Sequence, residues 1–209
     1  MPGDGEPDDP GLTAGRPALR PLLVVLTGGR SLRMGTDKAT LLVGGAPLAQ
    51  RPVAALGPLC SGVVLSGRSV PGIEATTVAD AVPGAGPLAA VAAVTAACPG
   101  RALLVVACDA PGVLPRLAAL LIAASADHDA AACVRADGTL EPLPLALSSG
   151  GAERLAAAAA TGIRSLRGGL GTVDLASVPE ARWREVDPDG ASLRSWNSPA
   201  DLGLLPRLP

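Results

Sequence analysis

Short unbroken runs of apolar residues mark the predicted core strands. Residues 22–26 (LLVVL), 62–66 (GVVLS) and 102–107 (ALLVVA) show no alternation with polar positions. Strands that are buried on both faces of a parallel sheet have this pattern, whereas half-exposed strands alternate. Shorter strands are expected at residues 40–43, 76–79, 130–134 and 142–147.

Helices are expected between these strands. The predicted helices cover residues 47–56, 88–97, 115–125 and 151–160. Pro52 limits or kinks the first of them. Strands and helices alternate through the first 125 residues, which predicts an α/β fold with a doubly wound, mostly parallel, Rossmann-like sheet and helices on both faces.

No linker divides the chain, so we expect a single domain at residues 21–209. Residues 1–20 are rich in Pro, Gly and Asp and have no apolar stretch of signal-peptide type. We expect them to form a disordered tail. The apolar runs are also too short to span a bilayer, and these features predict a cytoplasmic protein without membrane contact.

Composition narrows the class of function. Hydrophobic residues make up 48% of the chain, with no Phe or Tyr and two Trp, so the core must be built from small aliphatic side chains. A net charge of −2 argues against a nucleic-acid-binding surface. Four scattered cysteines and one histidine have no zinc-ligand spacing, which favours buried, reduced thiols.

A single lysine stands out among the basic residues. Sixteen of the 17 basic residues are Arg, and the remaining one is Lys38. Because lysine provides a compact point charge that arginine cannot reproduce, this position is a candidate for direct chemistry.

Lys38 lies in the most distinctive segment, LTGGRSLRMGTDKATLLVGGAPL, at residues 26–48. Glycines after a strand let successive N–H groups approach one phosphate, and Arg33 and Lys38 would add positive charge there. The segment is neither a GxxxxGK[ST] loop nor a GxGxxG loop. The alternative is an ordinary glycine-rich turn.

Other polar positions follow further predicted strands. Asp109 comes just after the predicted strand at residues 102–107, following Cys108, where a carboxylate could bind Mg²⁺ or cap the next helix. Asp80 precedes a GPLAAV helix start, where a helix N-terminus favours an anion, although it could equally be a solvated residue. Ser66 ends another strand and is either a ligand contact or a loop serine. Ligands of doubly wound sheets bind at these strand ends.

These segments together resemble the molybdenum cofactor guanylyltransferase family, whose pattern is roughly LAGGxSxRMGxDKxxLxxxGxPL. Related enzymes with nucleotide-diphospho-sugar-transferase-like folds carry similar loops with other endings. Asp37-Lys38 and Gly28-Gly29 resemble the guanylyl-transferring members, since cytidylyl-transferring relatives more often have Ala at the position of Gly28. Thr27 replaces the family's usual Ala.

The resemblance implies transfer of GMP from GTP to molybdopterin, with Mg²⁺ as cofactor and transient contacts with molybdenum-insertion proteins and molybdoenzymes. It implies catalytic roles for Lys38, Arg33 and Asp109, with Asp109 as the metal ligand. The implied nucleotide-binding residues are Leu26, Thr27, Gly28, Gly29, Ser31, Gly35, Lys38, Ser66, Asp80, Gly86 and Asp109.

The acceptor side matches the family less closely. Pro142 lies in a segment that resembles an acceptor-facing loop, and Asn197 matches the second Asn of the family's NxNTPxDL ending, where Ser195 replaces the first. Arg164 and Arg167 are either acceptor contacts or solvated arginines. Two other kinds of function stay open. One is a related enzyme, either a cytidylyltransferase for the same cofactor or a nucleotidyltransferase for another small acceptor. The other is a non-enzymatic carrier or chaperone of the cofactor.

Overall fold

The computed structural model describes residues 20–28, 38–80 and 84–196. Its strands are β1 (Leu22–Leu26), β2 (Leu42–Val43), β3 (Ala46–Pro47), β4 (Gly62–Ser66), β5 (Thr76–Val78), β6 (Leu103–Ala107), β7 (Ala130–Val134), β8 (Leu140–Leu147) and β9 (Leu175–Pro179). Its α-helices are α1 (Gln50–Leu56), α2 (Pro87–Ala97), α3 (Pro115–Ala124), α4 (Ser149–Ala160), α5 (Leu166–Leu170) and α6 (Glu180–Trp183). Three 3₁₀ helices are η1 (Lys38–Thr40), η2 (Gly57–Leu59) and η3 (Ala191–Leu193).

The central sheet has the strand order β5-β4-β1-β6-β8-β7-β9. β1 pairs in parallel with β4 and β6, and β4 pairs in parallel with β5. β7 also pairs in parallel with β9. Among the described strands of this sheet, β8 alone runs antiparallel to its neighbours, β6 and β7. The predicted doubly wound, mostly parallel sheet is confirmed.

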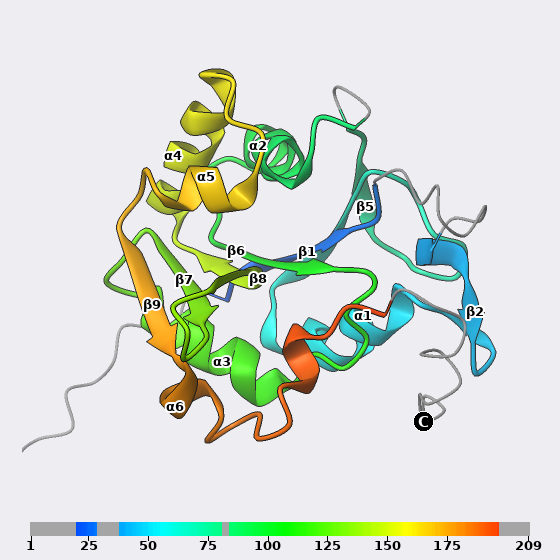
Figure 1. Ribbon diagram of the computed structural model, residues 1–209. Coiled ribbons are helices and arrows are strands. Elements are labelled where there is room, and N and C mark those ends of the chain that lie inside the picture. Colours follow the sequence, from blue (N-terminus) through cyan, green and yellow to red (C-terminus); the bar gives the residue numbers. More distant parts are fainter. Residues whose placement is uncertain (1–19, 29–37, 81–83, 197–209) are drawn as a thin grey trace, which may run out of the picture.

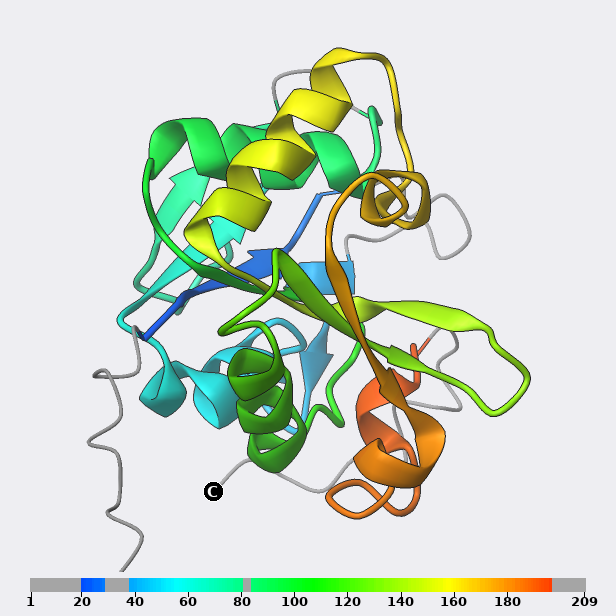
Figure 2. The ribbon, with the colours of Figure 1, turned by 90° about the vertical axis from the view of Figure 1, so that its left-hand side faces the viewer.

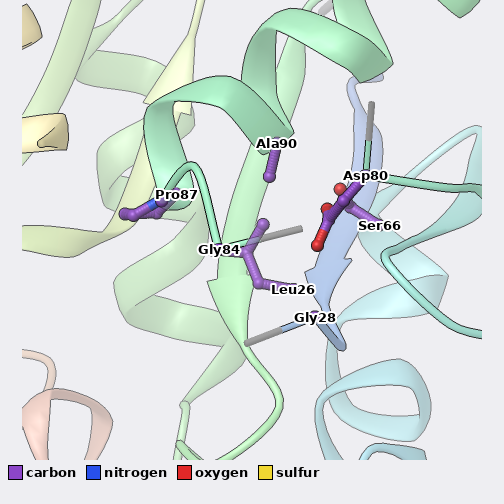
Figure 3. A pocket seen from close by; sticks show the side chains of 8 residues that line it. Leu26, Gly28, Ser66, Asp80, Gly84, Pro87 and Ala90 are labelled. Atoms are coloured by element: carbon purple, nitrogen blue, oxygen red, sulfur yellow. The ribbon is translucent and has the colours of Figure 1, made fainter. Parts of the chain in front are cut away.

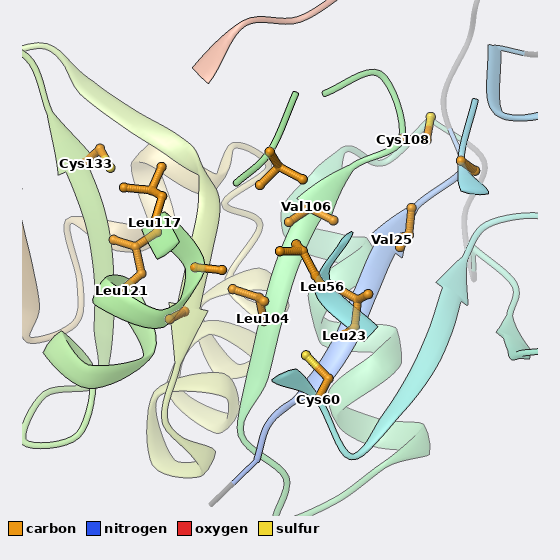
Figure 4. Packing of buried hydrophobic residues seen from close by; sticks show 14 of the residues in the cluster. Leu23, Val25, Leu56, Cys60, Leu104, Val106, Cys108, Leu117, Leu121 and Cys133 are labelled. Atoms are coloured by element: carbon orange, nitrogen blue, oxygen red, sulfur yellow. The ribbon is translucent and has the colours of Figure 1, made fainter. Parts of the chain in front are cut away.

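Helices cover both faces of the sheet (Figures 1 and 2). Leu23 and Val25 of β1 pack in a cluster with α1 and α3, while Leu22 and Val24 pack in a second cluster with α2, α4 and α5. Figure 4 shows the first cluster. Because successive side chains of a strand point to opposite faces, a strand between two helical layers must be apolar at every position. This explains the unbroken LLVVL run.

Small side chains fill most of the core, as the composition predicts. The largest fully buried side chain is Trp183, whose Nε1 donates a hydrogen bond to the Val134 carbonyl at 3.1 Å and so holds α6 against β7. Cys60 and Cys133 are free and buried. Burial raises the pKa of Cys60 to about 11, and burial followed by the nearby carboxylates of Asp187 and Glu141 raises the pKa of Cys133 to about 12. Both thiols therefore stay protonated at neutral pH, as expected for packing residues.

Three predicted helices begin at other residues, and one of them, α2, differs only by starting one residue earlier, at Pro87. The helix expected from residue 47 begins at Gln50, because Ala46 and Pro47 pair with β2 across a Gly44-Gly45 turn. This shift places Pro52 in the first helical turn, where a missing N–H costs little. The helix expected from residue 151 begins at Ser149, because the Ser148 hydroxyl accepts a hydrogen bond from the Gly151 N–H at 3.1 Å.

The N-terminal segment at residues 1–19 lies outside the described residues, so its predicted disorder and the domain boundary at residue 21 stay predictions. Within the described parts of the chain, every helix falls short of the length and apolar character that crossing a membrane requires.

Candidate active site

The polar segments that follow β1, β4 and β6 meet at one edge of the sheet, as predicted. Leu26 is in register with Ser66 on one side and with Ala107 on the other. The backbone N–H groups of Thr27 and Gly28 donate to the Ser66 carbonyl at 2.8 and 3.0 Å. Parallel strands place their carboxyl ends at the same edge, and ligands of open α/β sheets bind there.

Thr27 holds this edge together through its side chain. It is 3% exposed. Its Oγ1 accepts a hydrogen bond from the Arg68 N–H at 3.0 Å and lies 2.8 Å from the Arg68 carbonyl and 3.0 Å from the Ser66 carbonyl. The hydroxyl is therefore engaged with the loop after β4. Any contact of Thr27 with a nucleotide would be made by its backbone.

A pocket of about 300 Å³ opens beside this edge (Figure 3). It is lined by Leu26, Gly28, Ser66, Asp80, Gly84, Gly86, Pro87 and Ala90. Five of these residues were predicted to bind nucleotide. Pro87 belongs to the GPLAAV helix start that the sequence pointed to, whereas Gly84 and Ala90 were not singled out. Ala90 lies three residues after Pro87 on α2, and this helical spacing could have indicated it. The volume of the pocket falls within the range of small-molecule binding sites.

Ser66 offers this pocket a free hydroxyl. The residue is 1% exposed, and within the described chain its Oγ has no hydrogen-bond partner. Buried hydroxyls without partners are uncommon, so this atom is suited to bond a ligand. The start of α2 borders the same pocket, with Gly86 as N-cap at φ 96° and Pro87 in the first turn. The N-terminus of this helix favours negative charge.

Asp80 is held directly against Gly28. A Cβ added at Gly28 would lie 2.5 Å from Asp80 Oδ2. The absence of a side chain at residue 28 thus gives the Asp80 carboxylate its place in the pocket. The alternative of a solvated Asp80 is not supported, because the residue is half-buried and lines the pocket.

Lys38 and Asp109 form an ion pair at the same edge. Lys38 Nζ lies 3.2 Å from Asp109 Oδ2, and the two side chains are 17% and 21% exposed. The alternative that Asp109 caps the next helix is wrong, because α3 has Leu114 as its N-cap and no side-chain cap hydrogen bond. The two residues that the sequence singles out for charge and metal chemistry therefore meet each other.

The surroundings of Asp109 fit a magnesium site that is completed by substrate. Groups of three or more metal-ligating His, Cys, Asp or Glu are absent from residues 20–28, 38–80 and 84–196. Protein magnesium sites commonly use one or two carboxylates and take further ligands from substrate phosphates. A single, partly exposed carboxylate at the sheet edge matches this donor set.

Pro142, one of the predicted acceptor residues, also lies toward this edge. Pro142 lies near the start of β8, which runs beside β6. The Arg164 carbonyl lies 2.9 Å from the position of a Cβ at Gly86, and Arg167 Nη2 donates to the Leu140 carbonyl at 2.6 Å. The 164–167 segment therefore packs between the pocket and the start of β8.

Several predicted residues lie outside the described chain. These are Gly29, Ser31, Arg33 and Gly35 in the glycine-rich loop and Asn197 near the C-terminus. Their roles stay predictions.

Comparison with known proteins identifies the family. The MobA-like NTP transferase domain model matches residues 23–173. A probable molybdenum cofactor guanylyltransferase of Chloroflexus aggregans is 33% identical over 190 residues, which cover 87% of this chain and 91% of the relative. A probable molybdenum cofactor guanylyltransferase of Mycobacterium ulcerans is 32% identical over 86% of this chain and 90% of its own length.

Solved structures agree with this assignment. The molybdopterin-guanine dinucleotide biosynthesis protein A of Archaeoglobus fulgidus superposes with a TM-score of 0.72 at 25% identity, over 87% of this chain and 95% of that chain. The 2-C-methyl-D-erythritol 4-phosphate cytidylyltransferase of Thermus thermophilus shares the fold, with a TM-score of 0.61 at 21% identity over 87% of this chain and 95% of that chain. The chain therefore belongs to the MobA-like NTP transferase family and is a nucleotidyltransferase.

Proposed function

We propose that this chain is a molybdenum cofactor guanylyltransferase, which transfers GMP from GTP to molybdopterin, with or without bound molybdenum, and releases pyrophosphate. The observation that carries the proposal is the Lys38–Asp109 pair at the same sheet edge as the pocket. The names of the relatives support the choice of acceptor and nucleotide.

The pocket would hold the nucleoside part of GTP. Leu26 and Ala90 offer apolar contact, while the Ser66 hydroxyl and the Asp80 carboxylate offer hydrogen bonds. The close approach of Asp80 to Gly28 supports the choice of guanine, because the Ala that is more common in the cytidylyl-transferring relatives would collide with the carboxylate where it now lies.

The transfer itself needs positioning and charge neutralisation. An oxygen of the acceptor's terminal phosphate would attack the α-phosphorus of GTP as the bond to pyrophosphate breaks, without a covalent enzyme intermediate. Lys38 would place a point charge against the triphosphate, and Arg33 would stabilise the leaving pyrophosphate.

Asp109 would hold the metal. A divalent ion is typical of this family, and we propose that it is Mg²⁺ with Asp109 as its protein ligand. When bound, Mg²⁺ supplies Lewis acidity toward phosphate oxygens. Lys38 Nζ lies within ion-pair distance of the same carboxylate, at 3.2 Å. We also propose a cytoplasmic setting and transient contacts with molybdenum-insertion proteins and molybdoenzymes.

Pyrophosphate release from purified protein, Mg²⁺ and molybdopterin, measured with GTP, CTP, ATP and UTP in turn, tests the proposal. Release with GTP alone is the expected result, and Asp109→Asn should abolish most of it. Release with CTP alone would show that the substrate is CTP and that the enzyme is a cytidylyltransferase. No release with any nucleotide from a folded sample that binds molybdopterin would establish the carrier instead.

A further inference from the structure

The segment at residues 187–196, which we call the C-terminal bracket, is internally tied by one buried carboxylate. Asp187 is 1% exposed, and its Oδ1 and Oδ2 accept hydrogen bonds from the N–H groups of Ala191 and Ser192, both at 2.9 Å. Gly190 precedes η3 in the left-handed region with φ 64°. Two hydrogen bonds to one carboxylate fix the turn that presents Ser192.

The bracket contacts the loop that carries Asp109 at three successive points. The Trp196 N–H donates to the Asp109 carbonyl at 2.8 Å. The Ala191 carbonyl lies 2.9 Å from where a Cβ at Gly112 would be, so the backbones touch there. The hydroxyl of Ser192, which is 1% exposed, accepts a hydrogen bond from the Leu114 N–H at 3.0 Å.

The backbone hydrogen bonds within the loop are long, although Val113 packs in the core. The short-range backbone bonds of the loop, from Ala110 N to Ala107 O and from Val113 N to Ala110 O, are both long at 3.3 Å. The contacts from the bracket therefore supply the shorter hydrogen bonds at both ends of the loop, at Asp109 and at Leu114.

We infer that Ser192 and Asp187 are positioning residues for Asp109. They hold the loop so that the Asp109 carboxylate lies at the sheet edge opposite Lys38, where it can bind the metal during nucleotidyl transfer. The inference rests on the proposed function, because it assumes that Asp109 acts in nucleotidyl transfer. It also gives the C-terminal segment a role on the nucleotide side of the site, in addition to the acceptor contacts that the family resemblance implies.

Ser192→Ala tests this with little risk to folding, because it removes only the hydroxyl that orders Leu114. Groups that orient a metal ligand typically contribute 10–100-fold to metal affinity or activity. We expect kcat to fall about 10-fold with KM for GTP changed less than about 2-fold, because the bracket's hydrogen bonds at Ser192 and Trp196 go to the Asp109 loop, which does not line the pocket.

Ser148→Ala is the matched control. It also removes a serine hydroxyl that accepts a backbone N–H, at the start of α4 and at the opposite edge of the sheet. Both variants should lose similar thermal stability, and the control should keep wild-type kcat.

A second measurement does not depend on turnover. Binding of Mn²⁺ to the protein–GTP complex without acceptor, followed by electron paramagnetic resonance, should weaken about 10-fold in Ser192→Ala and stay unchanged in Ser148→Ala. Wild-type kcat and Mn²⁺ affinity in Ser192→Ala would overturn the inference. Equal losses in both variants would also overturn it and assign Ser192 a purely structural role. Failure of the proposed function is distinct, because the wild-type protein itself would then release no pyrophosphate from GTP.

Discussion

Gly28→Ala probes the contact that positions Asp80. The new Cβ would lie 2.5 Å from Oδ2, 3.2 Å from Cγ and 3.3 Å from Oδ1 of Asp80. Ordinary van der Waals contact begins near 3.4 Å, so the carboxylate must move by about 1 Å. Because the carboxylate is the free end of a side chain, it should rotate away while the backbone keeps its fold.

The expected cost is kinetic. Misplacement of a contacting group by about 1 Å can lower the rate about 10²-fold, so kcat/KM for GTP should fall 10- to 100-fold. Pyrophosphate release at varied GTP concentration measures this loss. Gly57→Ala is the control, since a Cβ at Gly57 meets nothing within 4 Å and its φ of −50° suits alanine.

Both variants should unfold within a few degrees of the wild-type protein. The reasoning is refuted if Gly28→Ala keeps kcat/KM for GTP within about 3-fold of wild type. It is also refuted if Gly57→Ala loses as much activity as Gly28→Ala, because the loss would then not depend on Asp80.

Three further predictions address the charge pair, the buried hydroxyl and the thiols. Lys38→Ala should lower turnover about 10²-fold, as removal of an oxyanion donor does, and Lys38→Arg should restore it only partly; a loss below about 3-fold would contradict a role in charge stabilisation. Thr27→Val should lower the free energy of unfolding by about 1–3 kcal/mol in urea titrations, because the Arg68 N–H loses its partner, and an unchanged stability would contradict a stabilising role of the Thr27 hydroxyl. The raised pKa values of Cys60 and Cys133 favour the protonated thiols in the folded state. Stability is therefore complete below the ordinary thiol pKa of 9.0 and should fall from pH 9 toward 11–12, and a double Cys→Ala variant should flatten this decline in pH-dependent unfolding.

The sequence predicts those features that depend on short-range pattern. The run at residues 22–26 identifies the central strand because burial on both faces forces every position to be apolar. The positions of Asp109 and Ser66 follow from the same pattern, since a parallel sheet carries the residues after its strands to one edge. The central strand and the shared edge of Asp109 and Ser66 can therefore be predicted from the order of strands and helices alone.

Contacts between segments distant in the chain are not predictable in this way. The fit of Gly28 against Asp80 depends on atomic positions that are set by the packing of β1, β4 and β5. The bracket around Asp109 depends on Ser192 reaching Leu114 from the far end of the chain. A buried serine and a buried aspartate have no periodicity, so nothing in the local sequence distinguishes them from loop residues.

Thr27 shows how a departure from a family pattern acquires a physical meaning. Thr27 is 3% exposed, and a buried hydroxyl without hydrogen-bond partners would destabilise the fold. Here the loop after β4 supplies carbonyl oxygens at Ser66 and Arg68 and a donor at the Arg68 N–H. The hydroxyl is therefore satisfied within the protein and turned away from the role of a ligand contact. Base preference should then depend on the Gly28–Asp80 contact and not on residue 27, so Thr27→Ala should change stability while leaving the preference for GTP over CTP intact.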